Sequence, residues 1–234
     1  VTRRWQDGAE VEGVVEILGN TRDGLPTAQD LKYHLAWSSV YAHDCKRAGR
    51  FLEHHDFTST QLLHRLNLSS DSGIHYRDVE RFIRVSATTS IVSTQAIFHK
   101  RTKRFVTDCF RVFDRAVMHG QQFDDEPGLQ CNRVWLSSWF RENLEENYAL
   151  TIDLERQLKL TRSAAQLLAA MLRCWSFAAR NDRCFQKLYA DLCALLGTPC
   201  YAHLSKAVEK LGPSLEELRQ FGYIVDWQIE HTRD

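Results

Sequence analysis

Two helix signals separated by a short polar turn lie between residues 58 and 87. Thr58 and Gln61 have the spacing of a capping box, which predicts a helix from Ser59 to about Leu66. A polar turn over 67–73 follows, and apolar residues then recur at helical spacing from Ile74 to Ala87. Two helices joined by so tight a turn predict a helix-turn-helix, which restricts the chain to a few small folds.

Two β-rich runs follow this helix pair directly. Residues 88–98 and 105–113 each place apolar side chains at period two, and the link between them, 99–104, is almost wholly basic. A hairpin in this position is typical of the wing of a winged-helix unit. Upstream we expect a strand over 11–18, a turn over 23–26 and a helix from a Thr27/Asp30 capping box to about Ala48. A further strand is expected over 133–140.

The remainder of the chain repeats this plan. Thr161 is expected to cap one helix, and a second is expected from about Gln186 to Leu196. Thr198-Pro199 then predicts the start of a long helix, kinked at Pro213, and residues 223–229 an apolar strand. The sequence therefore predicts a helix-rich α+β fold of two tandem winged-helix units, 1–145 and 146–234, in which the second wing would need a strand beyond residue 234.

The charge of the chain is balanced overall but unevenly distributed. The 30 basic and 30 acidic residues give a net charge of zero, which counts against a nucleic-acid partner because phosphate must be neutralised by Lys and Arg. Between residues 81 and 115, however, eight basic residues face two acidic ones. This concentration favours a DNA-binding surface in the first unit.

Eleven side chains are the candidate DNA contacts, and the alternative for each is a solvated surface. The first unit would hold the DNA backbone with a basic helix face and the hairpin tip, and the second would read base edges from the start of its long helix. The candidates are Arg77, Arg81, Arg84, Lys100, Arg101, Lys103, Arg104, His203, Ser205, Lys206 and Lys210.

Signatures of enzymes, metal sites and membrane spans are absent from the sequence. The seven cysteines form no Cys-x-x-Cys pair and no zinc-like spacing, so buried thiols in a reducing cytoplasm are expected. No phosphate-binding loop, dinucleotide fingerprint or His-Glu-x-x-His motif occurs. No apolar run reaches 18 residues. We therefore expect a cytoplasmic, non-enzymatic protein without a cofactor, a metal or a membrane partner.

Several short segments, in order, resemble the plasmid replication initiator protein A family. These segments are residues 23–30, 76–82 with 87–89, 139–140 with 150–153, 188–189 and 211–224. The resemblance implies an initiator that binds repeated origin sequences in double-stranded DNA, recruits host replication proteins and forms a homodimer through its first unit. Gly212, within the long helix, departs from the pattern of the family.

Two alternatives remain open from the sequence. A transcriptional repressor with the same tandem fold would differ from an initiator in the arrangement of its sites, because direct repeats favour initiation and a palindrome favours repression. A winged-helix protein-interaction module that binds no DNA is favoured by the zero net charge.

Overall fold

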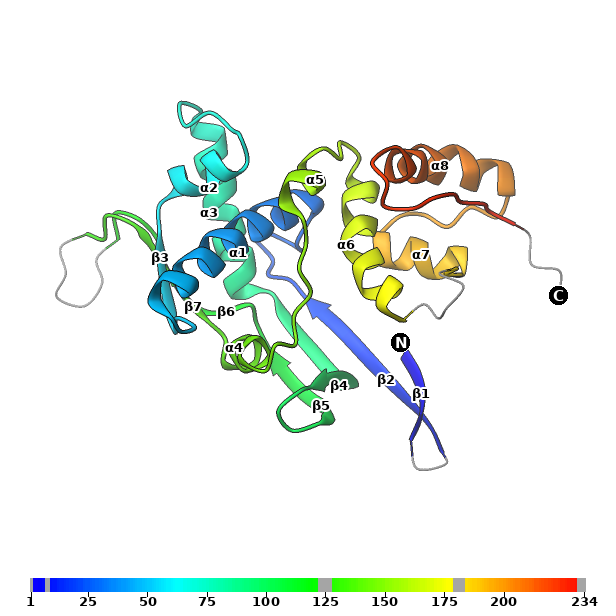
Figure 1. Ribbon diagram of the computed structural model, residues 1–234, viewed down its shortest axis with the longest axis horizontal. Coiled ribbons are helices and arrows are strands. Elements are labelled where there is room, and N and C mark those ends of the chain that lie inside the picture. Colours follow the sequence, from blue (N-terminus) through cyan, green and yellow to red (C-terminus); the bar gives the residue numbers. More distant parts are fainter. Residues whose placement is uncertain (1, 7–8, 122–127, 179–183, 231–234) are drawn as a thin grey trace. The chain divides into compact units, whose positions relative to one another are not determined.

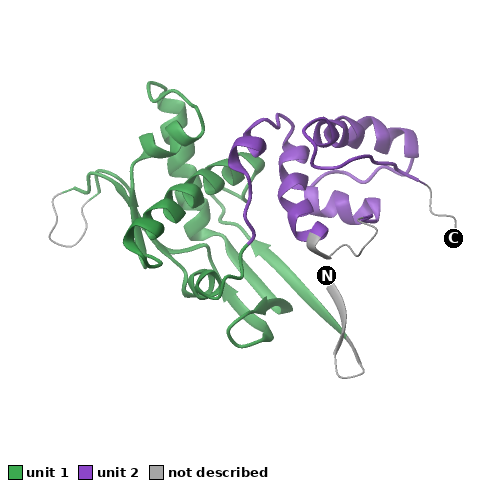
Figure 2. Ribbon diagram, viewed as in Figure 1, with its two compact units in different colours: residues 1–149 green, residues 150–234 purple. Residues whose placement is uncertain are grey.

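The computed structural model describes residues 2–6, 9–121, 128–178 and 184–230. The chain forms two compact units, residues 1–149 and 150–234 (Figure 2), so the division falls four residues after the expected one. The fold is mixed α+β and rich in helices, as expected. The elements of the first unit are β1 (Thr2–Gln6), β2 (Ala9–Leu18), α1 (Ala28–Ala48), β3 (His54–Phe57), α2 (Ser59–Arg65), α3 (Gly73–Thr88), β4 (Ser90–His99), β5 (Arg104–Phe110), β6 (Phe113–Val117), β7 (Asn132–Leu136) and α4 (Ser138–Glu145). Those of the second are α5 (Leu154–Leu158), α6 (Ser163–Ala178), α7 (Tyr189–Leu196) and α8 (Leu204–Gln220) (Figure 1).

Local capping signals determine where α1 and α2 begin. At the start of α1, the Thr27 hydroxyl accepts from the Asp30 N–H, and the Asp30 carboxylate accepts from the Thr27 N–H at 2.7 Å. Thr58 and Gln61 form the same reciprocal pair before α2. Each box satisfies two backbone N–H groups that the helix itself leaves without partners. Gly49 ends α1 in the left-handed conformation, with φ 67°. These predicted helix starts are confirmed.

The core of unit 1 lies among α1, α2, α3 and the small sheet β3–β7–β6. Tyr33, Phe82 and Phe113 are fully buried there, and the rings of Phe82 and Phe113 meet edge to face with centroids 5.9 Å apart. Leu62 and Leu63 on α2 are also fully buried. The two helices of the predicted helix-turn-helix therefore bury the apolar faces that the sequence spacing indicates.

The wing strands belong to a second antiparallel sheet, in the order β1–β2–β4–β5. A bulge in β4 interrupts the expected period of two, because the register with β5 shifts between Ser93 and Ile97. Gln95 has φ 55° there, and the Ser93 hydroxyl accepts from the Ile97 N–H at 3.1 Å. Three residues of β4, 94–96, lie opposite one residue of β5, so β4 has two extra residues here, and Ser93 at the start of the bulge is fully buried.

Two predicted strands are divided between different elements. The run over 105–113 ends as β5 at Phe110 and continues as β6 from Phe113, in the other sheet. The run over 133–140 is strand only to Leu136. Ser137 then caps α4, since its hydroxyl accepts from the Phe140 N–H at 3.5 Å. A period-two pattern does not reveal where a strand changes sheet, and this limits the prediction.

The regular elements of unit 2 are all helices in the part that the structure describes. Leu160, Ala165 and Leu168 form its core with Leu211 and Leu218 of α8. As predicted, α8 is one helix with Pro213 inside it, and Gly222, with φ 69°, follows its end. The close packing at Gly212 explains its lack of a side chain, because a Cβ there would lie 3.2 Å from the Trp227 ring.

Three predictions for unit 2 are wrong. Residues 198–203 are not helical, so α8 begins at Leu204 and not at Pro199. The Thr161 hydroxyl does not cap α6 but donates to Glu217 at 2.7 Å. Residues 223–229 form no strand; Tyr223, Ile224 and Ile229 instead pack on the helical core. Between residues 150 and 230 no strand is present among the described residues, so a second wing is not seen.

Candidate nucleic-acid interface

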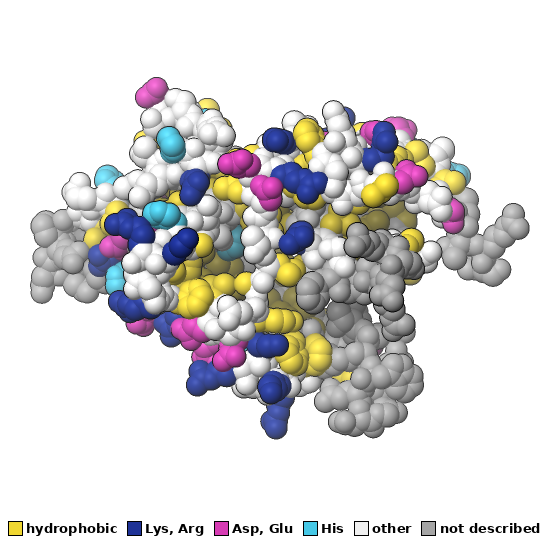
Figure 3. All heavy atoms as spheres, viewed as in Figure 1, with side chains coloured by type: hydrophobic (Ala, Val, Ile, Leu, Met, Phe, Trp, Pro, Cys, Tyr) yellow, Lys and Arg dark blue, Asp and Glu magenta, His cyan; other side chains and the backbone are white. Residues whose placement is uncertain are grey.

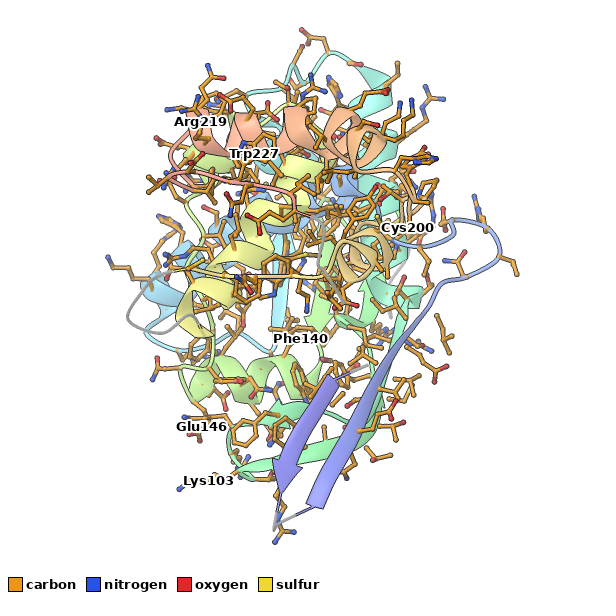
Figure 4. All side chains as sticks on the ribbon, turned by 90° about the vertical axis from the view of Figure 1, so that its right-hand side faces the viewer. Lys103, Phe140, Glu146, Cys200, Arg219 and Trp227 are labelled. Atoms are coloured by element: carbon orange, nitrogen blue, oxygen red, sulfur yellow. The ribbon has the colours of Figure 1, made fainter. Side chains whose placement is uncertain are left out.

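The β4–β5 hairpin carries the four basic residues predicted for a wing tip. Antiparallel pairing runs from Ile97↔Val106 to His99↔Arg104, and the turn between them contains Lys103 with φ 53°. The side chains of Lys100, Arg101, Lys103 and Arg104 are all exposed. Lys and Arg side chains project where Figure 1 places this tip (Figure 3), and Lys103 extends outward from it (Figure 4). The predicted hairpin is confirmed; its contact with DNA stays a prediction.

Helix α4 anchors this tip. The Lys100 N–H donates to the side-chain oxygen of Asn143 at 3.2 Å, and the Asn143 amide donates to the Trp139 carbonyl at 3.0 Å. At the end of β5 farthest from the tip, the Phe110 ring stacks on Trp139 with centroids 4.3 Å apart. Since Asn143 is 4% exposed, its bond to the turn is protected from water and holds the tip against α4.

The four tip cations differ in their partners. Arg101 lies 3.4 Å from the Glu142 carboxylate, and Lys100 lies over the ring of Tyr148, 5.9 Å from its centroid. Within the described residues, Lys103 and Arg104 have no ion-pair partner. Lys103 and Arg104 are therefore the tip cations most available to a phosphate.

Two of the three α3 arginines, which are partly exposed, are held by ion pairs to nearly buried carboxylates of the same unit. Arg81 pairs with Asp30 at the start of α1 and donates to the Asp23 carbonyl at 2.9 Å. Arg84 pairs with the carboxylate of Asp23 at 3.1 Å, and this partner holds the pKa of Asp23 below its usual value. The expectation that these two side chains form a solvent-facing basic surface is thus corrected. Arg77 is exposed, as expected.

The candidates in the second unit lie at the beginning of α8. His203 is the N-cap residue, and both it and Ser205 are exposed. The Lys206 ammonium donates to Glu209 at 2.8 Å, and this bond raises the pKa of Lys206. Lys210 lies 3.3 Å from the same carboxylate. Because one acidic residue serves two lysines, this face carries less positive charge than the sequence spacing indicated.

Sequence reasoning missed the contribution of α4. Glu142 and Asn143 contact the wing from about 40 positions further along the chain, as the separation of 43 between Lys100 and Asn143 illustrates. The sequence predicts a strand over 133–140, which includes the first residues of α4, and makes no prediction for Glu142 and Asn143. The one local helix signal of α4 is Ser137, three residues before Phe140, which is an ordinary N-cap spacing.

The described residues offer no metal site and no membrane span. No group of three or more His, Cys, Asp or Glu residues among them could hold a metal ion. None of their helices is long and apolar enough to cross a membrane. Cys109, Cys174, Cys184 and Cys200 are exposed, so the expectation of buried thiols is wrong for these four cysteines.

Solved structures share the fold of this chain. A crystal structure of domains 2 and 3 of RctB, determined from selenomethionine derivatives, has a TM-score of 0.59 and 16% sequence identity, and the match covers 94% of this chain and 77% of that one. A second crystal structure of RctB domains 2 and 3 has a TM-score of 0.55 at the same identity, covering 94% and 76%. No protein-family model matches the chain, and neither does a curated protein sequence. The similarity at this identity shows the fold.

Proposed function

We propose that this chain is a non-enzymatic replication initiator that binds repeated origin sequences in double-stranded DNA. The fold supports the proposal, because it is similar to domains 2 and 3 of RctB, a replication initiator. The observation that carries it is the exposed, anchored wing tip, on which Lys103 and Arg104 have no ion-pair partner among the described residues. A plasmid replicon, a homodimer, host replication proteins as partners and action in the cytoplasm are further parts of this proposal.

The two units would divide the work. In unit 1 the wing tip and Arg77 would contact phosphates, while Arg81 and Arg84 would support the fold from within. In unit 2 the start of α8 would enter a major groove, with His203 and Ser205 exposed to base edges. Lys206 and Lys210 would exchange the Glu209 carboxylate for DNA.

The test is fluorescence anisotropy on labelled duplex DNA, titrated from about 50 to 200 mM salt. Each phosphate contact contributes about 0.9 to the slope of log affinity against log salt. The double variant Lys103→Ala/Arg104→Ala should therefore lower the slope by about 1.8, so that the wild type loses roughly tenfold more affinity than the variant over this range. The matched control is Arg47→Ala, which removes an exposed charge near the end of α1.

The results separate the candidate functions. An unchanged slope in the double variant would refute the wing as a phosphate contact. Lys206→Ala should reduce the preference for one sequence over another rather than the affinity for all. Selection of bound sequences would then favour an initiator if direct repeats emerge and a repressor if a palindrome does. No binding at any salt would favour a protein-interaction module, with which the zero net charge agrees.

A further inference from the structure

Among the described residues, one carboxylate from outside the hairpin lies beside the wing tip. The same oxygen of Glu142, on α4, lies 3.4 Å from Arg101 and 3.4 Å from the ring Nε2 of His99. The Arg101 side chain is 65% exposed, whereas that of Glu142 is 29% exposed. One partner of the ion pair is thus free to turn towards a ligand, and the other is partly enclosed.

The position of Glu142 is fixed from two sides. His99 is 8% exposed, its Nδ1 accepts from the Thr102 N–H at 3.3 Å, and its Nε2 lies 3.4 Å from the Glu142 carboxylate. The next residue on α4, Asn143, accepts from the Lys100 N–H. The Glu142 carboxylate therefore stays beside the tip, and its side chain does not move freely among many conformations.

A carboxylate so placed presents to Arg101 the same chemistry as a DNA phosphate. Both are anionic oxygen acceptors that a guanidinium binds through charge-assisted hydrogen bonds. We propose that Glu142 is an internal competitor for Arg101, which lowers the affinity of the wing for the DNA backbone until a phosphate displaces it. This inference rests on the proposed function and adds to it a residue that sets the strength of backbone contact.

The contrast within the tip supports this role. Lys103 and Arg104, two and three positions further on, have no ion-pair partner among the described residues. These two side chains would meet the DNA first, and Arg101 would join only when the backbone lies close enough to replace Glu142. A wing of this kind binds loosely to DNA that it cannot approach closely.

The variant Glu142→Gln tests the proposal, because it removes the charge and keeps a side chain of the same length and nearly the same shape beside His99 and Arg101. Anisotropy on duplex DNA at about 50 mM salt should show binding about 1.4- to 5-fold tighter than the wild type, the range expected for loss of a surface ion pair. The salt slope should steepen by up to about 0.9, one phosphate contact. The matched control is Glu146→Gln, which removes an exposed charge at the same end of unit 1 (Figure 4).

Arg101→Ala makes the test specific. In the Arg101→Ala background Glu142→Gln should have no more effect than Glu146→Gln, because the competed cation is gone. Weaker binding by Glu142→Gln, an equal gain from Glu146→Gln, or a gain that persists without Arg101 would each overturn the internal competitor while the wild type still binds DNA. Absence of binding by the wild type and by Glu142→Gln alike would overturn both this inference and the proposed function.

Discussion

Arg81 on α3 stabilises the fold through its ion pair with Asp30 and is not available for DNA contact. This assignment predicts a measurable loss of stability when Arg81 is replaced. The Asp30 side chain is 7% exposed, and Arg81 bridges it to the carbonyls of Asp23 and Leu25, at 2.9 and 3.4 Å. Replacing Arg81 by Met leaves a nearly buried carboxylate without its cation. Removal of one partner of a buried pair costs about 3–5 kcal/mol. The two bonds from Thr27, both 2.7 Å, remain with Asp30 and place the expected loss at the lower end, about 3 kcal/mol.

Hydrogen exchange at increasing urea concentration, followed by mass spectrometry of peptides from α1 and α3, measures this loss in unit 1 alone. The control Arg77→Met removes the same charge from the exposed side of α3 and should change the free energy of unfolding by less than about 0.5 kcal/mol.

Asp30→Asn supplies the second arm of a double-mutant cycle. The amide oxygen of the asparagine can still accept at the capping box, but the side chain is uncharged, so removal of Arg81 leaves no unpaired buried charge. Arg81→Met should therefore lower the free energy of unfolding by less in this background. The structural assignment of Arg81 is refuted if Arg81→Met costs under about 1 kcal/mol, or if the cost is the same with Asn at position 30.

Three further outcomes are expected. Burial lowers the pKa of His34 to about 4, whereas that of an unfolded histidine is about 6.5. Between these two pKa values the folded state binds fewer protons than the unfolded state. The free energy of unfolding should therefore be highest above pH 6.5 and fall by up to about 2 kcal/mol on acidification to pH 5. Urea midpoints should show this fall, and His34→Gln should reduce it. Gly212→Val would drive a side chain into the Trp227 ring, and should expose residues 223–230 to limited proteolysis. Glu217→Ala removes the acceptor of two bonds from Thr161 and one from the Arg162 N–H, and should lower the urea midpoint of unit 2 by an amount equivalent to about 1–3 kcal/mol; an unchanged midpoint would contradict the role assigned to this carboxylate.

The candidate site was only partly predictable. The four cations of the wing tip were identified because a basic link between two period-two runs is visible in the sequence alone. Nothing in their spacing showed that Arg101 meets Glu142 or that Lys103 does not. At the start of α8 the sequence indicates the two lysines, but their spacing does not show that Glu209 pairs with both.

Sequence by itself determined the features that depend on residues within one turn of each other. The capping boxes of α1 and α2, the left-handed glycine after α1 and the continuity of α8 through Pro213 follow from contacts no more than about four positions apart. Tertiary structure decided the rest. It moved the chain from β5 to a different sheet at β6, packed residues 223–229 on helices instead of pairing them as a strand, and gave Arg81 a partner 51 positions away. The physical reason is that a charged or apolar side chain takes whichever partner the folded chain brings near, and periodicity records that a face is apolar or basic without recording what will cover it.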